Sequence, residues 1–195
     1  MPLLGFGVLR MKDPEECERC VRTALECGYR MFDTAAAYGN ERAVGVSNFS
    51  PERLTDLCLS SEIPPMVNQV ELHPFYHQEA ALRNMRELGV QPQAWAPLCE
   101  GLKNIFTNKI LGKIGKRYGK TQAQTALRWN VDRGVSVVTR SGVPEHIRED
   151  MDIWDFCLTE ADKRAVDVLD LGYSEILDYG NPCIARMFLR NMRQG

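Results

Sequence analysis

The chain has 195 residues, of which 44% are hydrophobic and 26% charged, and its formal net charge is -2. This composition is typical of a globular domain, and the absence of a basic run argues against nucleic acid or an anionic membrane surface as a partner. No apolar run approaches the roughly 20 residues that span a bilayer, and the first residues do not have the pattern of a signal peptide. Seven scattered cysteines do not form a disulfide framework, and Cys17-x-x-Cys20 has no second pair that would complete a metal site, so they favour a cytoplasmic location.

In chain order, strands and helices are predicted to alternate. An apolar run over 3–8 is followed by a helix that Asp13 caps and Pro14 begins. Buried strands follow over 30–35 and 42–48. The remaining predicted elements are a helix over 51–59, a strand over 66–72, a helix over 78–88, a strand over 91–97, helices over 105–118 and from 121, a strand over 136–140, and helices over 144–151 and 159–169. The tail over 171–195 has no clear period.

The link between the strands over 30–35 and 42–48 is too short for parallel neighbours. It has about six residues, whereas a crossover between parallel strands needs about a dozen or more, usually as a helix. We therefore infer that an internal segment is missing near 41–43. The two strand edges that such a loss leaves uncovered favour self-association of the chain through these edges.

Polar or aromatic residues follow the predicted strands where each one ends. Alternating strands and helices indicate a parallel sheet, and no GxGxxG follows the first strand, which argues against a Rossmann fold. In a barrel of parallel strands, side chains at the carboxyl ends of the strands build the site. The sequence therefore favours a barrel, with these residues at the strand ends: Asp33, Ser47, Asn48, Gln69, Trp95, Arg140 and Ser141.

Five ordered motifs carry a resemblance to a known family. DTAAAYGNE at 33–41, GVSNFS at 45–50, NQVELHP at 68–74, AWAPL at 94–98 and YGKTQAQTALRW at 118–129 together resemble the aldo-keto reductases. The resemblance implies a (β/α)8 TIM-type barrel that binds NADP(H) across its carboxyl face. Because about six of eight strand–helix units are found, we expect one incomplete barrel domain over 1–195 with an irregular tail.

The resemblance also implies a catalytic group of Asp, Tyr, Lys and His. Asp33 and Tyr38 match the first two members, while the strands that carry the Lys and the His are absent. His73 lies in the NQVELHP motif, where the family histidine is structural, so it is not the missing catalytic histidine.

The cofactor residues implied by the resemblance fall into two groups. Ser47, Asn48 and Gln69 would hold the nicotinamide carboxamide, and Trp95 would stack on the nicotinamide ring; ordinary packing at a strand end is the alternative for Gln69 and Trp95. The residues implied for the adenosine end are Arg140 and Ser141 at the 2′-phosphate and Glu149 at the adenosine. This chain departs from the family pattern with Ala96 for Ser, His146 for Arg and Asp150 for Asn, and we expect Asp150 to add negative charge near the phosphate.

Three functions remain open at this point. The first is an NADPH-dependent oxidoreductase that reduces small aldehydes or ketones to alcohols by hydride transfer. The second is a non-catalytic module that binds the cofactor or serves as an accessory subunit. The third is a truncated gene product without activity of its own.

Overall fold

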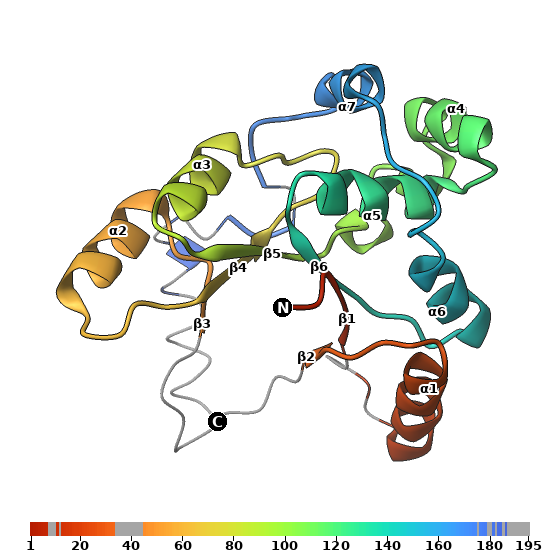
Figure 1. Ribbon diagram of the computed structural model, residues 1–195, viewed down its shortest axis with the longest axis horizontal. Coiled ribbons are helices and arrows are strands. Elements are labelled where there is room, and N and C mark those ends of the chain that lie inside the picture. The colour runs from red at the N-terminus through yellow and green to blue at the C-terminus, as the bar shows by residue number, and fades with distance from the viewer. Residues whose placement is uncertain are drawn as a thin grey trace.

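A six-stranded parallel sheet forms the centre of the molecule. The computed structural model describes residues 1–7, 11, 13–33, 45–174, 176–178, 181, 183, 184 and 186. Within them, the sheet has the strand order β2-β1-β6-β5-β4-β3, and every described pair of neighbours is parallel (Figure 1). The strands are β1 (Leu4–Gly7), β2 (Phe32–Asp33), β3 (Gly45–Ser47), β4 (Val67–Glu71), β5 (Gln91–Trp95) and β6 (Ser136–Thr139).

This strand order is that of a ring opened at one place. β1 pairs with both β2 and β6, and the order then runs back through β5 and β4 to β3. The two strands at the open edges, β2 and β3, are consecutive in the chain. A sheet in which all other consecutive strands are neighbours, and the first pairs with the last, is an α/β arrangement of the barrel type. The predicted fold class, with six strand units, is therefore confirmed for the described residues.

Contacts on the inner side show that the sheet is curved. The Gln93 side-chain amide on β5 donates a hydrogen bond to the sulfur of Met31, which precedes β2, at 3.4 Å. Two strands, β6 and β1, lie between β5 and β2 in the sheet. Gly5 on β1 makes room for this side chain, since a Cβ there would lie 2.4 Å from the Met31 methyl carbon.

Helices pack around the outside of the arc (Figure 1). Side-chain caps begin several of them where the sequence predicts: Asp13 accepts from the backbone N–H of Glu15, Ser50 from that of Arg53, and Thr121 from that of Gln124. The helices are α1 (Pro14–Glu26), α2 (Pro51–Ser60), α3 (Glu79–Glu87), α4 (Lys109–Tyr118), α5 (Gln122–Asp132), α6 (Pro144–Met151) and α7 (Glu160–Asp167), with short 3-10 turns at Cys99–Gly101 and Ile105–Thr107.

Two predicted elements differ from the structure. The helix predicted over 105–118 is divided into a 3-10 turn and α4, because Asn108 adopts an extended backbone (φ -61°, ψ 126°) and its side chain caps α4. The strands predicted over 30–35 and 42–48 are described only as β2 and β3, each with one neighbour in the sheet. Residues 34–44, which include the predicted break near 41–43, lie outside the described residues.

The core lies between the sheet and the surrounding helices. Phe6, Leu72, Leu82 and Leu127 are fully buried there, and Trp129 is 1% exposed. None of the described helices combines the length and apolar character needed to cross a bilayer.

Candidate functional site

Four residues predicted for the cofactor are joined at the carboxyl ends of β3, β4 and β5. The Ser47 hydroxyl donates to the backbone oxygen of Gln69 at 3.0 Å and accepts from the Asn48 side-chain amide at 3.2 Å. The indole N–H of Trp95 donates to the side-chain oxygen of Asn48 at 2.8 Å. Asn48 has a left-handed backbone (φ 57°), which Asn tolerates better than most residues. The structure therefore brings Ser47, Asn48, Gln69 and Trp95 together.

Gln93 adds a fifth polar group to this cluster. The side-chain N–H2 of Gln69 donates to the side-chain oxygen of Gln93 at 2.7 Å, while Gln93 donates to Met31. The amide oxygen of Gln69 accepts no hydrogen bond from the described residues, so it remains an acceptor. The sequence analysis did not identify Gln93. Because Gln93 stands two residues before Trp95, the two side chains lie on the same face of the strand.

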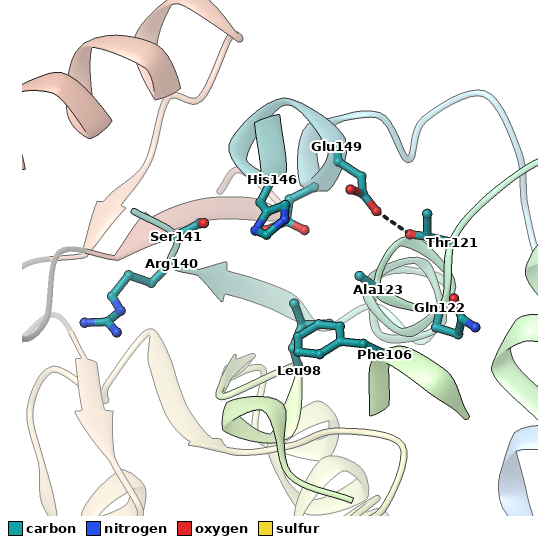
Figure 2. A pocket seen from close by; sticks show the side chains of 10 residues that line it. Leu98, Phe106, Thr121, Gln122, Ala123, Arg140, Ser141, His146 and Glu149 are labelled. Atoms are coloured by element: carbon teal, nitrogen blue, oxygen red, sulfur yellow. Dashed lines mark hydrogen bonds between the residues drawn. The ribbon is translucent and has the colours of Figure 1, made fainter. Parts of the chain in front are cut away.

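A cleft of about 430 Å³ begins beyond the end of β6 (Figure 2). Arg140 and Ser141 lie at one end of it, and Thr121 and Glu149 face each other at the other end. All three residues predicted for the adenosine end, Arg140, Ser141 and Glu149, therefore line the same cleft. The other lining residues are Leu98, Phe106, Gln122, Ala123, His146 and Asp150.

Asp150 does not carry the full negative charge that the sequence led us to expect. Its side chain is buried, with 5% of the residue exposed. Burial raises the pKa of Asp150 to about 7; the Thr139 hydroxyl opposes this shift, and the charge of Glu149 adds to it. At neutral pH the carboxyl is therefore near its midpoint, and its repulsion of an anion in the cleft is smaller than expected.

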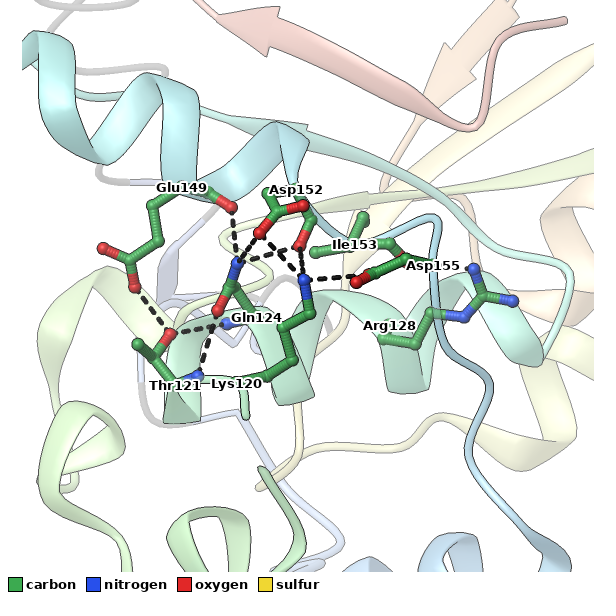
Figure 3. Close-up of polar contacts among 8 residues, drawn as sticks. All are labelled: Lys120, Thr121, Gln124, Arg128, Glu149, Asp152, Ile153 and Asp155. Atoms are coloured by element: carbon green, nitrogen blue, oxygen red, sulfur yellow. Dashed lines mark hydrogen bonds and ion pairs between the residues drawn. The ribbon is translucent and has the colours of Figure 1, made fainter. Parts of the chain in front are cut away.

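Hydrogen bonds and ion pairs between α5 and the segment at the end of α6 fix the cleft wall (Figure 3). The Thr121 hydroxyl donates to a carboxylate oxygen of Glu149 at 2.6 Å, and the Gln124 side chain donates to the backbone oxygen of Asp152 at 2.8 Å. The Lys120 ammonium pairs with Asp152 and Asp155, both at 2.8 Å. The capping-box pattern from Thr121 to Gln124 was visible in the sequence, but its contacts with α6 were not.

The two predicted catalytic residues are not placed by the structure. Tyr38 lies outside the described residues, and Asp33 ends β2 with only its backbone described. His73 is fully buried, with its Nε2 3.1 Å from a carboxylate oxygen of Glu71 and its Nδ1 accepting from the backbone N–H of Phe75 at 3.2 Å. Both ring nitrogens of His73 are thus engaged in local structure.

Comparison with protein families decides the membership of this chain. The model of the aldo/keto reductase family matches residues 39–170. The chain belongs to the aldo/keto reductase family. The match includes every predicted cofactor residue of this chain, as well as the whole of the cleft described above.

A curated relative and two solved structures show the extent of the likeness. The uncharacterized oxidoreductase YtbE of Bacillus subtilis is 36% identical, over 87% of this chain and 89% of its own. MGS-M4, an aldo-keto reductase from a deep-sea metagenome library, superposes with a TM-score of 0.84 at 24% identity, over 93% of this chain and 96% of its own. The crystal structure of a mutant of Gox0644 in complex with NADPH superposes with a TM-score of 0.77 at 22% identity, over 87% of this chain and 90% of its own.

The alignment with YtbE is longer than this chain. It has 252 positions, whereas the chain has 195 residues, so at least 57 positions have no counterpart here.

Proposed function

We propose that this aldo/keto reductase binds NADP(H) along the carboxyl edge of its sheet and acts on small aldehydes and ketones, with turnover far below that of a complete barrel. The observation that carries the proposal is the joined group of Ser47, Asn48, Gln69 and Trp95 beside a cleft that has Arg140 at one end. Gox0644, which has the same fold, is known with NADPH bound.

The residues at the ends of β3 and β4 fit the nicotinamide end. A carboxamide presents both donors and an acceptor, and Ser47, Asn48 and Gln69 offer both kinds of group. The amide oxygen of Gln69 is an acceptor that the described residues leave unpaired. Trp95, held by its bond to Asn48, offers an indole face of fixed orientation to a planar ring.

The residues of the cleft fit the adenosine end. A guanidinium suits a phosphate group, so Arg140 would bind the 2′-phosphate, with the Ser141 hydroxyl as a neutral donor. His146 adds an imidazole to the lining of the cleft. Glu149 offers a carboxylate to amine or hydroxyl donors of adenosine. The raised pKa of Asp150 reduces its repulsion of a 2′-phosphate, so this carboxyl opposes NADPH binding less than the sequence suggested.

When bound, NADPH would supply a hydride for the substrate carbonyl carbon. The part we assign to Tyr38 is to give a proton to the carbonyl oxygen. Asp33 matches the residue that, in complete members of the family, holds the lysine that lowers the pKa of the tyrosine. A phenol has an unperturbed pKa of about 10, and this chain has no matching Lys or His. Since a positioned acid contributes about 10²–10⁴ in rate, we expect the loss of its supports to reduce turnover by a similar factor.

We infer that the missing segment lies between β2 and β3. The two strands are consecutive in the chain but occupy opposite edges of the sheet, and the alignment with YtbE contains at least 57 unmatched positions. We further propose that the open edges pair with a second copy of the chain. The seven cysteines do not have the spacing of a disulfide framework in the sequence, which supports a reducing compartment such as the cytoplasm.

Titration with NADPH, followed by tryptophan fluorescence, tests the proposal. We expect saturable quenching in the wild type and its loss in Trp95→Phe, with Trp154→Phe as the control because Trp154 lies 46% exposed and does not line the cleft. Quenching without reduction of a simple aldehyde would favour the non-catalytic module. A folded wild type that shows no quenching would contradict cofactor binding and favour the truncated product without activity.

A further inference from the structure

Thr121 links two helices at the wall of the cleft. Its hydroxyl accepts from the backbone N–H of Gln124 at 3.2 Å and so caps α5. The same hydroxyl donates its proton to the Oε1 atom of Glu149 on α6 at 2.6 Å, as Figures 2 and 3 show. This distance is that of a strong hydrogen bond to a charged acceptor, which restricts the orientation of the carboxylate.

The helices themselves are held together by other contacts. The Gln124 side-chain amide donates to the backbone oxygens of Glu149 at 3.1 Å and Asp152 at 2.8 Å. Lys120, whose side chain is 6% exposed, pairs with Asp152 and Asp155 and does not line the cleft. Loss of the Thr121 hydroxyl would therefore leave α5 and α6 joined, and would free the Glu149 side chain in particular.

The hydrogen bond between Thr121 and Glu149 leaves the second carboxylate oxygen of Glu149 available to a ligand. Oε2 of Glu149 accepts no hydrogen bond from the described residues, while Oε1 is occupied by Thr121. A carboxylate with one oxygen fixed presents the other in a defined direction, and it does so without the entropy loss of ordering the side chain on binding. Amine and hydroxyl groups are the donors that such an oxygen accepts.

We propose that Thr121 is a positioning residue, which holds the Glu149 carboxylate ready for an amine or hydroxyl donor of the adenosine moiety. This inference rests on the proposed function, in which the cleft takes the adenosine end of NADP(H). Thr121 would not contact the ligand itself and would act on it through the Glu149 carboxylate.

A double-mutant cycle with 2′,5′-ADP as the probe, measured by isothermal titration calorimetry, tests the role. Thr121→Gly removes the hydroxyl, and glycine still serves as a helix N-cap with only a small loss of stability. We expect Thr121→Gly to weaken binding about tenfold and Thr121→Ser to bind as the wild type does. In a Glu149→Ala background, Thr121→Gly should have no further effect.

Lys120→Met is the matched control for a general loosening of the two helices. It removes contacts between the same segments through a side chain that does not line the cleft. We therefore expect a lower unfolding midpoint, with the affinity for 2′,5′-ADP within twofold of the wild type. Unchanged affinity in Thr121→Gly, an equal loss in Lys120→Met, or additive losses in the double variant would each overturn the role of Thr121. A wild type that binds no 2′,5′-ADP would overturn the proposed function itself.

Discussion

Asp150 couples the stability of the cleft wall to pH. Its pKa is raised by burial from an ordinary 3.8 to about 7, so between these values the folded chain holds a proton that the unfolded chain has released. Stability contributed by this group is complete below about pH 4 and is lost as the pH rises to 7. We expect the loss to total about 2–4 kcal/mol.

Asp150→Asn should therefore remove this part of the pH dependence and stabilise the protein at pH 8. Denaturant unfolding at several pH values between 5 and 8 measures it. Asp155→Asn is the control, because the ion pair with Lys120 lowers the pKa of Asp155 and places its titration below this range. If the wild type and Asp150→Asn lose stability in parallel between pH 5 and 8, the buried carboxyl of Asp150 does not contribute to the pH dependence of the free energy of unfolding.

At the scale of the elements, α4 and α5 pack so closely that one glycine of α4 cannot be replaced. A Cβ on Gly115 would lie 2.4 Å from the backbone oxygen of Lys120 and 2.6 Å from the Thr125 hydroxyl. On Gly112, one turn earlier, a Cβ would approach closely only the end of the flexible Gln122 side chain, at 2.9 Å. The same substitution at the two positions should thus have opposite effects.

We expect Gly115→Ala to destabilise the fold by about 1–3 kcal/mol through steric overlap with the backbone. Gly112→Ala should be neutral or stabilising by up to about 1 kcal/mol, because alanine favours the helix. Chemical denaturation of both variants measures the difference. Equal stability of the two variants would mean that the backbone at the start of α5 shifts easily to make room for the new Cβ. That result would contradict the view that this segment is a fixed part of the cleft wall.

At the scale of the whole molecule, the open sheet predicts association. Within the described residues β3 has β4 as its only neighbour in the sheet, so none of them pairs with its outer edge. We expect the chain to form dimers or larger species in a concentration-dependent way. Val46→Lys, which places a charge on β3, should shift the distribution toward monomer in sedimentation velocity experiments.

Leu59→Lys is the control for general loss of apolar surface, because Leu59 is 81% exposed on α2, outside the sheet. It should leave the distribution unchanged. A wild type that is monomeric at all concentrations would contradict pairing through the open edges.

Local signals in the sequence predicted much of this fold. The features that they did not predict depend on contacts between residues far apart in the chain. Asp13, Ser50 and Thr121 mark helix starts because a cap acts within three residues. The break at Asn108 was hidden, since hydrophobic periodicity alone does not register an extended residue that caps the next helix. Asp150 lines the cleft, and its burial, which the sequence did not predict, depends on elements far away in the chain.

The pairing of β1 with β6 has a consequence for biosynthesis. Leu4 lies opposite Val137, and the backbone N–H of Val137 donates to the oxygen of Leu3 at 2.9 Å. At about 5–20 residues per second, a ribosome needs on the order of ten seconds between making these two strands. During that interval β1, α1 and β2 have no sheet to join, so the nascent chain exposes apolar segments that a chaperone can bind. The first strand to be made completes its pairing only with the last.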